Sequence, residues 1–123
     1  MLAKMLSPIV RILSSAEDNA KLEALNRSQA IIEFKLDGTI ITANQNFLNA
    51  MGYRLEEIQA QHHSIFVDKD YAQSNEYRGF WHSLNRGEIQ SGEFSRINKA
   101  GEIIWIQASY NLLCDGFGKP YKI

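Results

Sequence analysis

Cysteine and proline are scarce in this sequence, and neither sign of charge dominates it. Among 123 residues there are one cysteine and two prolines, and the net charge is −1 at pH 7. The single Cys114 excludes an internal disulfide and any zinc site built from several cysteines, which favours a reducing compartment such as the cytoplasm. The 13 basic residues are scattered, so no positive patch for nucleic acid is expected.

Long hydrophobic runs and catalytic motifs are also missing. Lys4 and Arg11 interrupt the apolar residues near the start, which leaves no stretch of about 20 apolar residues to cross a membrane. No nucleophile with a matching base, phosphate-binding glycine loop or set of metal ligands stands out, and Glu56 and Glu57 are typical of a solvated helix face. We therefore expect neither direct membrane contact nor an enzyme in this segment. The 45% hydrophobic content suits one domain with one core.

Residues 1–27 form a separate segment with a helical pattern. Apolar side chains recur there with alternating steps of four and three residues, the spacing of a short heptad seam. The seam positions are Leu2, Leu6, Ile9, Leu13, Ala16 and Ala20. The pattern predicts an amphipathic helix that either caps its own domain or joins two copies of the chain in a homodimer. The compact domain is expected over residues 28–123.

The first half of this domain predicts a strand, a tight turn, a second strand and a helix. Asp37-Gly38 lies between two β-rich segments and is a strong hairpin signal. Asn44 is expected to cap a helix over residues 45–51, and Gly52 is expected to end it. The chain thus turns from sheet to helix within two residues.

The middle of the chain predicts two further helices. A short one is expected over residues 54–59, followed by an irregular segment over residues 60–68 and a longer helix over residues 70–86. Helical spacing gives the longer helix a large aromatic surface toward the core. Its buried face would be Tyr77, Phe80, Trp81 and Leu84.

The last third predicts a second hairpin, with strands over residues 92–97 and 103–113. Alternation places Ile106 and Tyr110 on the core side of the second strand. Trp105 would lie on the outer side, where the N-terminal helix or a second copy could cover it. Residues 119–123 read as the opening of another strand, so the last strand is expected to be truncated.

The order of these elements resembles a PAS domain over about residues 28–123. The motifs that carry the resemblance are Asp37-Gly38-Thr39-Ile40, Asn44-Gln45-Asn46-Phe47, Gly52-Tyr53 with Leu55-Glu56-Glu57-Ile58, and Asn98-Lys99-Ala100-Gly101 with Glu102-Ile103-Ile104-Trp105. Within the family, Phe80-Trp81-His82-Ser83-Leu84 and Ser91-Gly92-Glu93-Phe94 are similar to the sensor domains of bacterial energy-taxis and methyl-accepting chemotaxis proteins. The resemblance implies an α+β fold, with a five-stranded antiparallel sheet, helices on one face and a small pocket between them.

Such a domain would couple pocket occupancy or redox state to a chemotaxis-type output, made by a signalling domain elsewhere in the parent chain. The alternative is a PAS dimerisation module with an empty core filled by side chains. Pockets in this family hold flavin, haem, a small metabolite or nothing. The candidate cofactor-binding residues are Trp81, Arg96, His63, Asn44, Ile106 and Tyr110.

Among cofactors, the resemblance favours FAD over haem. Trp81 occupies the position where redox-sensing relatives pack an aromatic ring near the flavin. Light-sensing relatives of the LOV type carry a reactive cysteine where this chain has His63, so an adduct between flavin and cysteine is excluded. His63 is instead the best candidate for a haem ligand, which would mean gas sensing, although a His-His pair in a polar loop is more often a solvated turn.

Arg96 is the clearest departure from the flavin pattern, because relatives usually carry an amide there. Arginine offers only donors and a permanent charge, so it could hold a flavin carbonyl, a reduced anionic ring or a carboxylate. The simpler interpretation, which we prefer on sequence alone, is that Arg96 pairs with a nearby glutamate or extends to water.

Overall fold

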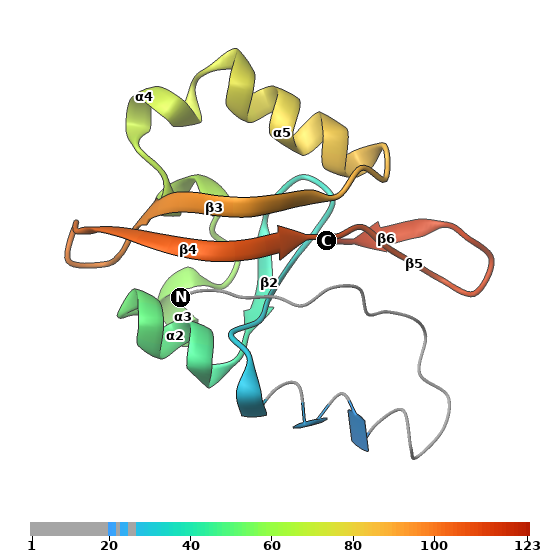
Figure 1. Ribbon diagram of the computed structural model, residues 1–123, viewed down its shortest axis with the longest axis horizontal. Coiled ribbons are helices and arrows are strands. Elements are labelled where there is room, and N and C mark those ends of the chain that lie inside the picture. Colours follow the sequence, from blue (N-terminus) through green and yellow to red (C-terminus); the bar gives the residue numbers. More distant parts are fainter. Residues whose placement is uncertain (1–19, 22, 25–26) are drawn as a thin grey trace.

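The computed structural model describes residues 20–21, 23–24 and 27–123 (Figure 1). This part of the chain combines short helices with antiparallel strands, the α+β arrangement expected from the sequence. In chain order the elements are β1 (Ile32–Phe34), β2 (Ile40–Ala43), α2 (Gln45–Met51), α3 (Leu55–Ile58), the 3₁₀ helix η1 (His63–Phe66), α4 (Lys69–Ala72), α5 (Asn75–Asn85), β3 (Gln90–Ile97), β4 (Ile103–Tyr110), β5 (Leu113–Cys114) and β6 (Pro120–Lys122). None of the helices in the described ranges has the length and apolar character needed to span a membrane.

The predicted heptad helix falls mostly outside the described residues. Of its seam positions, only Ala20 is described, and it lies in a helical segment with an exposed side chain. The amphipathic character of residues 1–27 and their role in self-association therefore stay predictions.

The strands pair as three antiparallel ladders, β1 with β2, β3 with β4, and β5 with β6. Backbone hydrogen bonds join the first ladder to the end of the chain, because Phe34 N donates to Ile123 O at 2.5 Å and Ile123 N donates to Phe34 O at 2.9 Å. The strand predicted over residues 103–113 is divided into β4 and β5, with Asn111 and Leu112 between them. In Figure 1, α5 runs beside the β3–β4 ladder and the β5–β6 hairpin extends past its end.

The turn between β1 and β2 forms at Asp37-Gly38, as predicted. Gly38 has a φ of 92°, its N–H donates to Lys35 O at 2.9 Å, and Asp37 Oδ1 accepts from Thr39 N at 2.9 Å. His62 packs directly on this turn, since its Nε2–H donates to the carbonyl of Asp37 at 2.8 Å. A Cβ atom on Gly38 would lie 2.5 Å from Nε2 of His62, so only glycine fits here.

Helix α2 begins and ends at the predicted residues. Asn44 has an extended backbone, and its Oδ1 accepts from Phe47 N at 3.0 Å. Gly52 follows the last helical residue, and its N–H donates to Leu48 O at 2.8 Å.

The helix predicted over residues 70–86 is two helices, α4 and α5, which is a correction to the sequence reading. Ser74 separates them, because its Oγ accepts from Tyr77 N at 3.1 Å and donates to Tyr71 O at 2.6 Å. That side chain ends one helix and caps the next. The buried face of α5 is as predicted, with Tyr77, Phe80, Trp81 and Leu84 all in the core.

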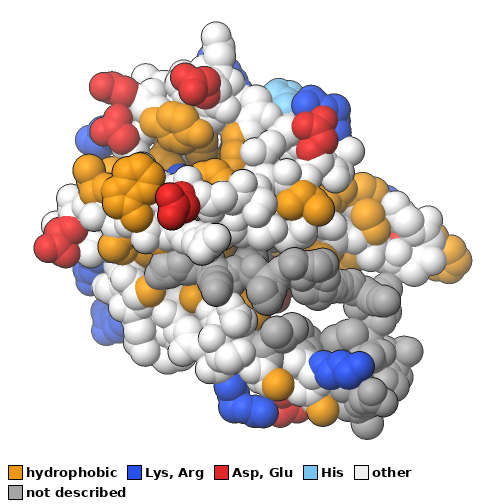
Figure 2. Space-filling model, in the orientation of Figure 1, with side chains coloured by type: hydrophobic (Ala, Val, Ile, Leu, Met, Phe, Trp, Pro, Cys, Tyr) orange, Lys and Arg blue, Asp and Glu red, His pale blue; other side chains and the backbone are white. Residues whose placement is uncertain are grey.

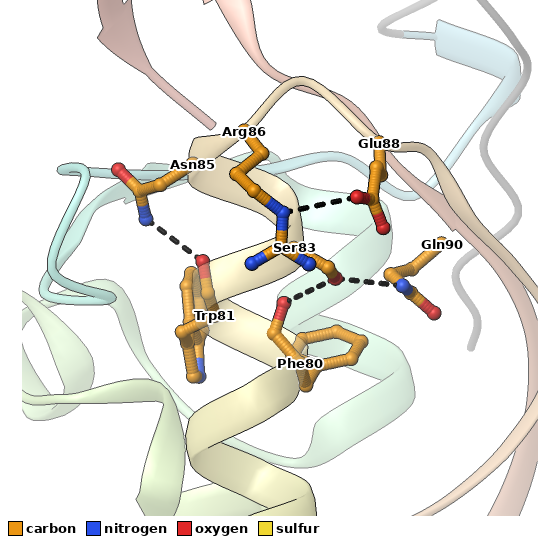
Figure 3. A network of polar contacts seen from close by, with 7 residues as sticks. All are labelled: Phe80, Trp81, Ser83, Asn85, Arg86, Glu88 and Gln90. Atoms are coloured by element: carbon orange, nitrogen blue, oxygen red, sulfur yellow. Dashed lines mark hydrogen bonds and ion pairs between the residues drawn. The ribbon is translucent and has the colours of Figure 1, made fainter.

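The C-terminal end of α5 is tied to its neighbours by side-chain hydrogen bonds (Figure 3). Ser83 Oγ accepts from Gln90 Nε2 at 2.7 Å, which connects α5 to the start of β3. Asn85 Nδ2 donates at 2.9 Å to both Trp81 O and Leu36 O, and the second bond reaches the β1–β2 turn. The end of α5 is therefore bonded to both the start of β3 and the β1–β2 turn.

One hydrophobic core connects the helices to the strands. Its buried members are Phe34, Ile40, Phe47, Leu48, Met51, Ile58, Phe66, Val67, Tyr77, Phe80, Trp81, Leu84, Ile106, Ala108, Tyr110 and Ile123. Alternation along β4 follows the prediction, because Ile106 and Tyr110 are buried whereas Trp105 is 71% exposed and Ile103 is 68% exposed. Figure 2 shows hydrophobic side chains gathered on this outer face.

Alanine substitution should separate backbone strain from close contact in the β1–β2 turn. Gly101 also has a positive φ, 83°, but a Cβ added there would meet no atom within 4 Å among the described residues, so Gly101→Ala should lower the free energy of unfolding by about 1 kcal/mol. Gly38→Ala adds the clash with His62 and should cost about 3 kcal/mol. Urea unfolding measures both, and equal losses would contradict the packing of His62 on the turn.

Candidate functional site

A small cavity lies inside the domain, between strands, α2 and η1. Its lining is mostly apolar and comes from β1, α2, η1, β3 and β4: Ile32, Phe34, Phe47, Met51, His63, Phe66, Arg96, Ile106 and Tyr110. The space open to the centre of a water molecule is about 10 Å³, which is room for about one water. Side chains thus fill most of the interior that separates the helices from the strands.

His63 is the most deeply buried polar residue of the site, with 2% of its surface exposed. It is the first residue of η1, and its backbone N–H donates to Gly38 O at 2.9 Å, which fixes it beside the β1–β2 turn. Its ring lies between two phenols, with Nδ1 2.7 Å from Tyr77 Oη and Nε2 3.1 Å from Tyr110 Oη. The interpretation of this residue as part of a solvated turn is therefore wrong.

Arg96 lies on β3 and points into the core, with only 6% of its surface exposed. Its Nε and Nη2 both donate to Tyr110 Oη, at 3.3 and 3.0 Å, and Nη1 donates to Ser95 O at 2.9 Å. The guanidinium also lies over the ring of Phe94, 4.9 Å from its centroid, which is a cation–π contact. Across the described residues, no carboxylate forms an ion pair with it.

The preferred sequence interpretation of Arg96 is therefore wrong on both counts, because the side chain neither pairs with a glutamate nor extends to water. The cause is its register in the sheet. Arg96 pairs with Ile104 across the β3–β4 ladder, on the same face as Phe94 and Ile106. That face is covered by α5 and the core, so the side chain cannot reach solvent.

The hydrogen bonds form one directed chain of four side chains. Two N–H groups of Arg96 occupy the lone pairs of Tyr110 Oη, so the hydroxyl proton of Tyr110 is left to donate to Nε2 of His63. We infer that His63 then carries its proton on Nδ1 and donates to Tyr77 Oη. The hydrogen-bonded chain runs from β3 along the wall of the cavity, by way of β4 and η1, to α5.

Of the four hydrogen-bonded side chains, only Arg96 is charged. Burial, reinforced by the positive charge of Arg96 and by His62, holds the pKa of His63 well below its ordinary 6.5. Burial also raises the pKa of Tyr77 to about 12 and raises the pKa of Tyr110, although the adjacent Arg96 opposes the shift at Tyr110. Both phenols and the imidazole are thus neutral at pH 7.

The remaining predicted site residues are placed differently. Ile106 lines the cavity, as Tyr110 does, whereas Trp81 lies just beside it, with its ring centroid 5.4 Å from that of His63. The indole Nε1 of Trp81 is buried and forms no well-aligned hydrogen bond among the described residues, although it lies close enough to the Tyr77 hydroxyl to oppose the rise in the pKa of that phenol. Asn44 is not part of the cavity lining.

The side chain of Asn44 binds backbone instead. Besides capping α2, its Oδ1 accepts from Ile31 N at 2.9 Å, and its Nδ2 donates to Gln29 O at 2.6 Å. These bonds hold the chain entering β1 against the start of α2. We therefore assign Asn44 a structural role in this arrangement.

Tyr77 is a polar member of the site, but the sequence predicts it only as a core residue. The available signal is its residue type, because a tyrosine on a buried helix face needs a partner for its hydroxyl where a phenylalanine does not. The identity of that partner, His63, depends on how η1 packs on α5, which no local pattern contains.

Haem ligation does not fit the histidines as arranged here. Both ring nitrogens of His63 are bound to tyrosine hydroxyls, and those of His62 are bound to Asp37 O and Ser64 N. His82, the third histidine, is exposed on α5. An axial bond from His63 or His62 would cost at least one of these hydrogen bonds.

Flavin fits the site in part. Arg96 and the indole N–H of Trp81 would donate to the acceptor atoms of the flavin ring, which would supply redox sensitivity. The cavity would have to open, because it has room for about one water.

Protonation of His63 should destabilise the fold. Since the pKa of His63 is lowered on folding, the unfolded chain binds the extra proton first, and stability should fall as the pH drops below 6.5, by at most about 1.4 kcal/mol per pH unit. Urea unfolding between pH 7.5 and 5.5 measures this slope, above the range where carboxylates titrate. His63→Gln should flatten it, and the exposed His82→Gln should not. An unchanged slope in His63→Gln would contradict the assignment.

Comparisons with known proteins show the family of this chain. Residues 40–123 match the sequence family described as the PAS fold. The biofilm dispersion protein BdlA of Pseudomonas aeruginosa is 44% identical over 107 residues, which are 87% of this chain and 26% of that protein. The aerotaxis receptor of Escherichia coli is 31% identical over 74 residues, which are 60% of this chain and 14% of that protein. The chain thus spans about a quarter or less of the curated relatives it matches.

Known structures show the same fold. A light-oxygen-voltage domain, studied with a flavin analogue, superposes with a TM-score of 0.69 over 88% of this chain and 82% of its own, at 24% sequence identity. That likeness concerns the fold alone. The match over residues 40–123, which is more than half of the sequence, shows that the chain belongs to the PAS-fold family.

Proposed function

We propose that this chain is a cytoplasmic sensory domain that couples a change in the occupancy or redox state of its pocket to a chemotaxis-type output. The observation that carries the proposal is the hydrogen-bonded chain from Arg96 through Tyr110 and His63 to Tyr77. Arg96, Tyr110 and His63 line the cavity, and His63 is hydrogen-bonded to Tyr77 on α5. A ligand that enters would therefore change contacts on β3 directly and act on α5 through His63. A ligand that binds two arrangements differently shifts their populations.

Other side-chain hydrogen bonds also connect α5, the helix that carries Tyr77, to its neighbours. The bond between Ser83 and Gln90 couples α5 to β3 (Figure 3), and the bond from Asn85 to Leu36 couples α5 to the β1–β2 turn. A displacement of α5, passed on through His63, would therefore reach the β3–β4 ladder. This is the route by which a buried event could alter the outer face of the sheet.

The relatives support a role in signalling rather than catalysis. The proteins similar to this chain are a biofilm dispersion protein and an aerotaxis receptor, and the shared segment is a small part of each. By analogy, the output would come from another part of the parent protein.

A second candidate function is dimerisation without any ligand. The small free volume of the cavity favours it, because a core already filled by side chains needs no cofactor to be stable. Trp105 and Ile103 would provide the contact on the outer face of β4, together with residues 1–27. The two candidates make different predictions for the purified chain.

Native mass spectrometry and an absorption spectrum of the chain, purified without added cofactor, would separate the candidates. A sensor should carry a bound molecule above the chain mass of 14.0 kDa, with absorption at about 450 nm if the molecule is flavin or a Soret band if it is haem. Ile106→Trp, which fills the cavity, should lose the added mass, and Gln107→Trp on the outer face of β4 should keep it. A bare mass for the unmodified chain would favour the module without ligand.

Self-association can be tested on the outer face of the sheet. If Trp105 and Ile103 contact a second copy, Trp105→Ser should lower the mass measured by light scattering toward that of a monomer. Phe117→Ser, which removes a 98% exposed aromatic from the β5–β6 turn, should leave the mass unchanged. A chain without residues 1–27 shows whether that segment contributes. An unchanged mass in both Trp105→Ser and the shortened chain would rule out this dimer.

A further inference from the structure

We propose that the cavity binds a small apolar carboxylic acid, in its carboxylate form, through Arg96. The inference rests on the proposed sensory function and names the chemical class of its ligand. It requires three properties of the site: an unneutralised charge, a donor edge shaped for a carboxylate, and apolar walls.

The charge of Arg96 is buried without an opposite charge. The side chain is 6% exposed, and the described residues supply no carboxylate within ion-pair distance. Its partners are a neutral phenol, a backbone carbonyl and aromatic faces. An ion held in a protein interior without a counter-charge is costly, because hydrogen bonds to neutral groups replace only part of its hydration.

No other member of the hydrogen-bonded chain can provide the missing negative charge. Tyr110 and Tyr77 both have a raised pKa, so neither becomes a phenolate near pH 7, and His63 can only add positive charge. Oxidised flavin is a neutral ring and would leave the same deficit at Arg96. A ligand that completes this site carries a negative charge.

The donor edge of Arg96 has the form that binds a carboxylate. Its Nε and Nη2 form one side of the guanidinium fork, and both converge on the single oxygen of Tyr110. A carboxylate would give each of these donors its own oxygen, in the bidentate geometry that arginine favours. Guanidinium has five N–H donors, and three of them account for the hydrogen bonds described above, so two further donors remain available.

The rest of the cavity limits what the carboxylate can be attached to. Its other walls are Ile32, Phe34, Phe47, Met51, Phe66 and Ile106. These side chains offer no partner to a second charge or to hydroxyl groups, so the ligand has one carboxylate and an apolar body. Because the free space holds about one water, binding must displace side chains, and Met51 is the one best able to move.

Binding of this kind would act directly on the proposed signal route. A carboxylate that takes Nε and Nη2 releases Tyr110 from Arg96, and the proton that Tyr110 donates to His63 is then free to reorient. Ligand entry thus breaks the hydrogen-bonded chain at its β3 end.

Calorimetric titration of the purified chain with paired probes tests the proposal. Butanoate, hexanoate and octanoate should bind at least about tenfold more tightly than the primary alcohols of equal length, because only the carboxylates pair with Arg96. The preference should disappear in Arg96→Met and survive, weakened, in Arg96→Lys. Arg54→Met, at an arginine whose side chain is 75% exposed, should retain the full preference.

Thermal unfolding gives a second readout that needs no ligand. Arg96→Met removes an unneutralised charge from the core and should melt at the same temperature as the unmodified chain or higher, while octanoate should raise the melting temperature of the unmodified chain only. Equal binding of carboxylates and alcohols, or a preference that persists in Arg96→Met, would overturn the proposal. A flavin that co-purifies would overturn it too but leave the sensory function standing, whereas a chain that binds no ligand of any kind would overturn both.

Discussion

A permanently charged guanidinium inside an aromatic core is the constraint that orients the polar side chains in the interior of this domain. Arg96 cannot lose its proton, so its surroundings must provide acceptors and polarisable faces, and Tyr110 and Phe94 do so. Tyr110 then has its hydroxyl proton directed at His63, and His63 is directed at Tyr77. The orientation of four side chains thus follows from one charge.

This arrangement gives the core two different kinds of order. The apolar side chains pack without direction, so many arrangements of similar volume would serve equally well. The hydrogen-bonded chain is directional, and it is satisfied only when β3, β4, η1 and α5 stand in one relative position. A domain built in this way has one defined resting arrangement. That arrangement would change if a ligand replaced the Tyr110 hydroxyl as the acceptor for Arg96.

The parts of this structure that the sequence predicts are those set by neighbours along the chain. The Asp37-Gly38 turn, the Asn44 cap and the alternation along β4 each depend on a few consecutive residues, and all were recovered. The sequence does not predict the break at Ser74, because the helical pattern continues past this residue and obscures its capping role. The burial of His63 and Arg96 depends on contacts between segments that are distant in sequence. Their residue types alone favour solvent exposure, whereas the fold gives both side chains tyrosine hydroxyls as hydrogen-bond partners.

The packing of His62 on the β1–β2 turn has a consequence for how this family can vary. The missing Cβ of residue 38 and the imidazole of residue 62 occupy one shared volume, and the imidazole also holds the carbonyl of Asp37. A smaller residue at position 62 would remove the closest contact of a Cβ at position 38, but the φ of 92° and the ring of Trp81, 3.1 Å away, would still oppose a side chain there. A relative with a side chain at position 38 would need a different backbone conformation in this turn as well as a smaller residue at position 62, and its turn would need another donor for the Asp37 carbonyl.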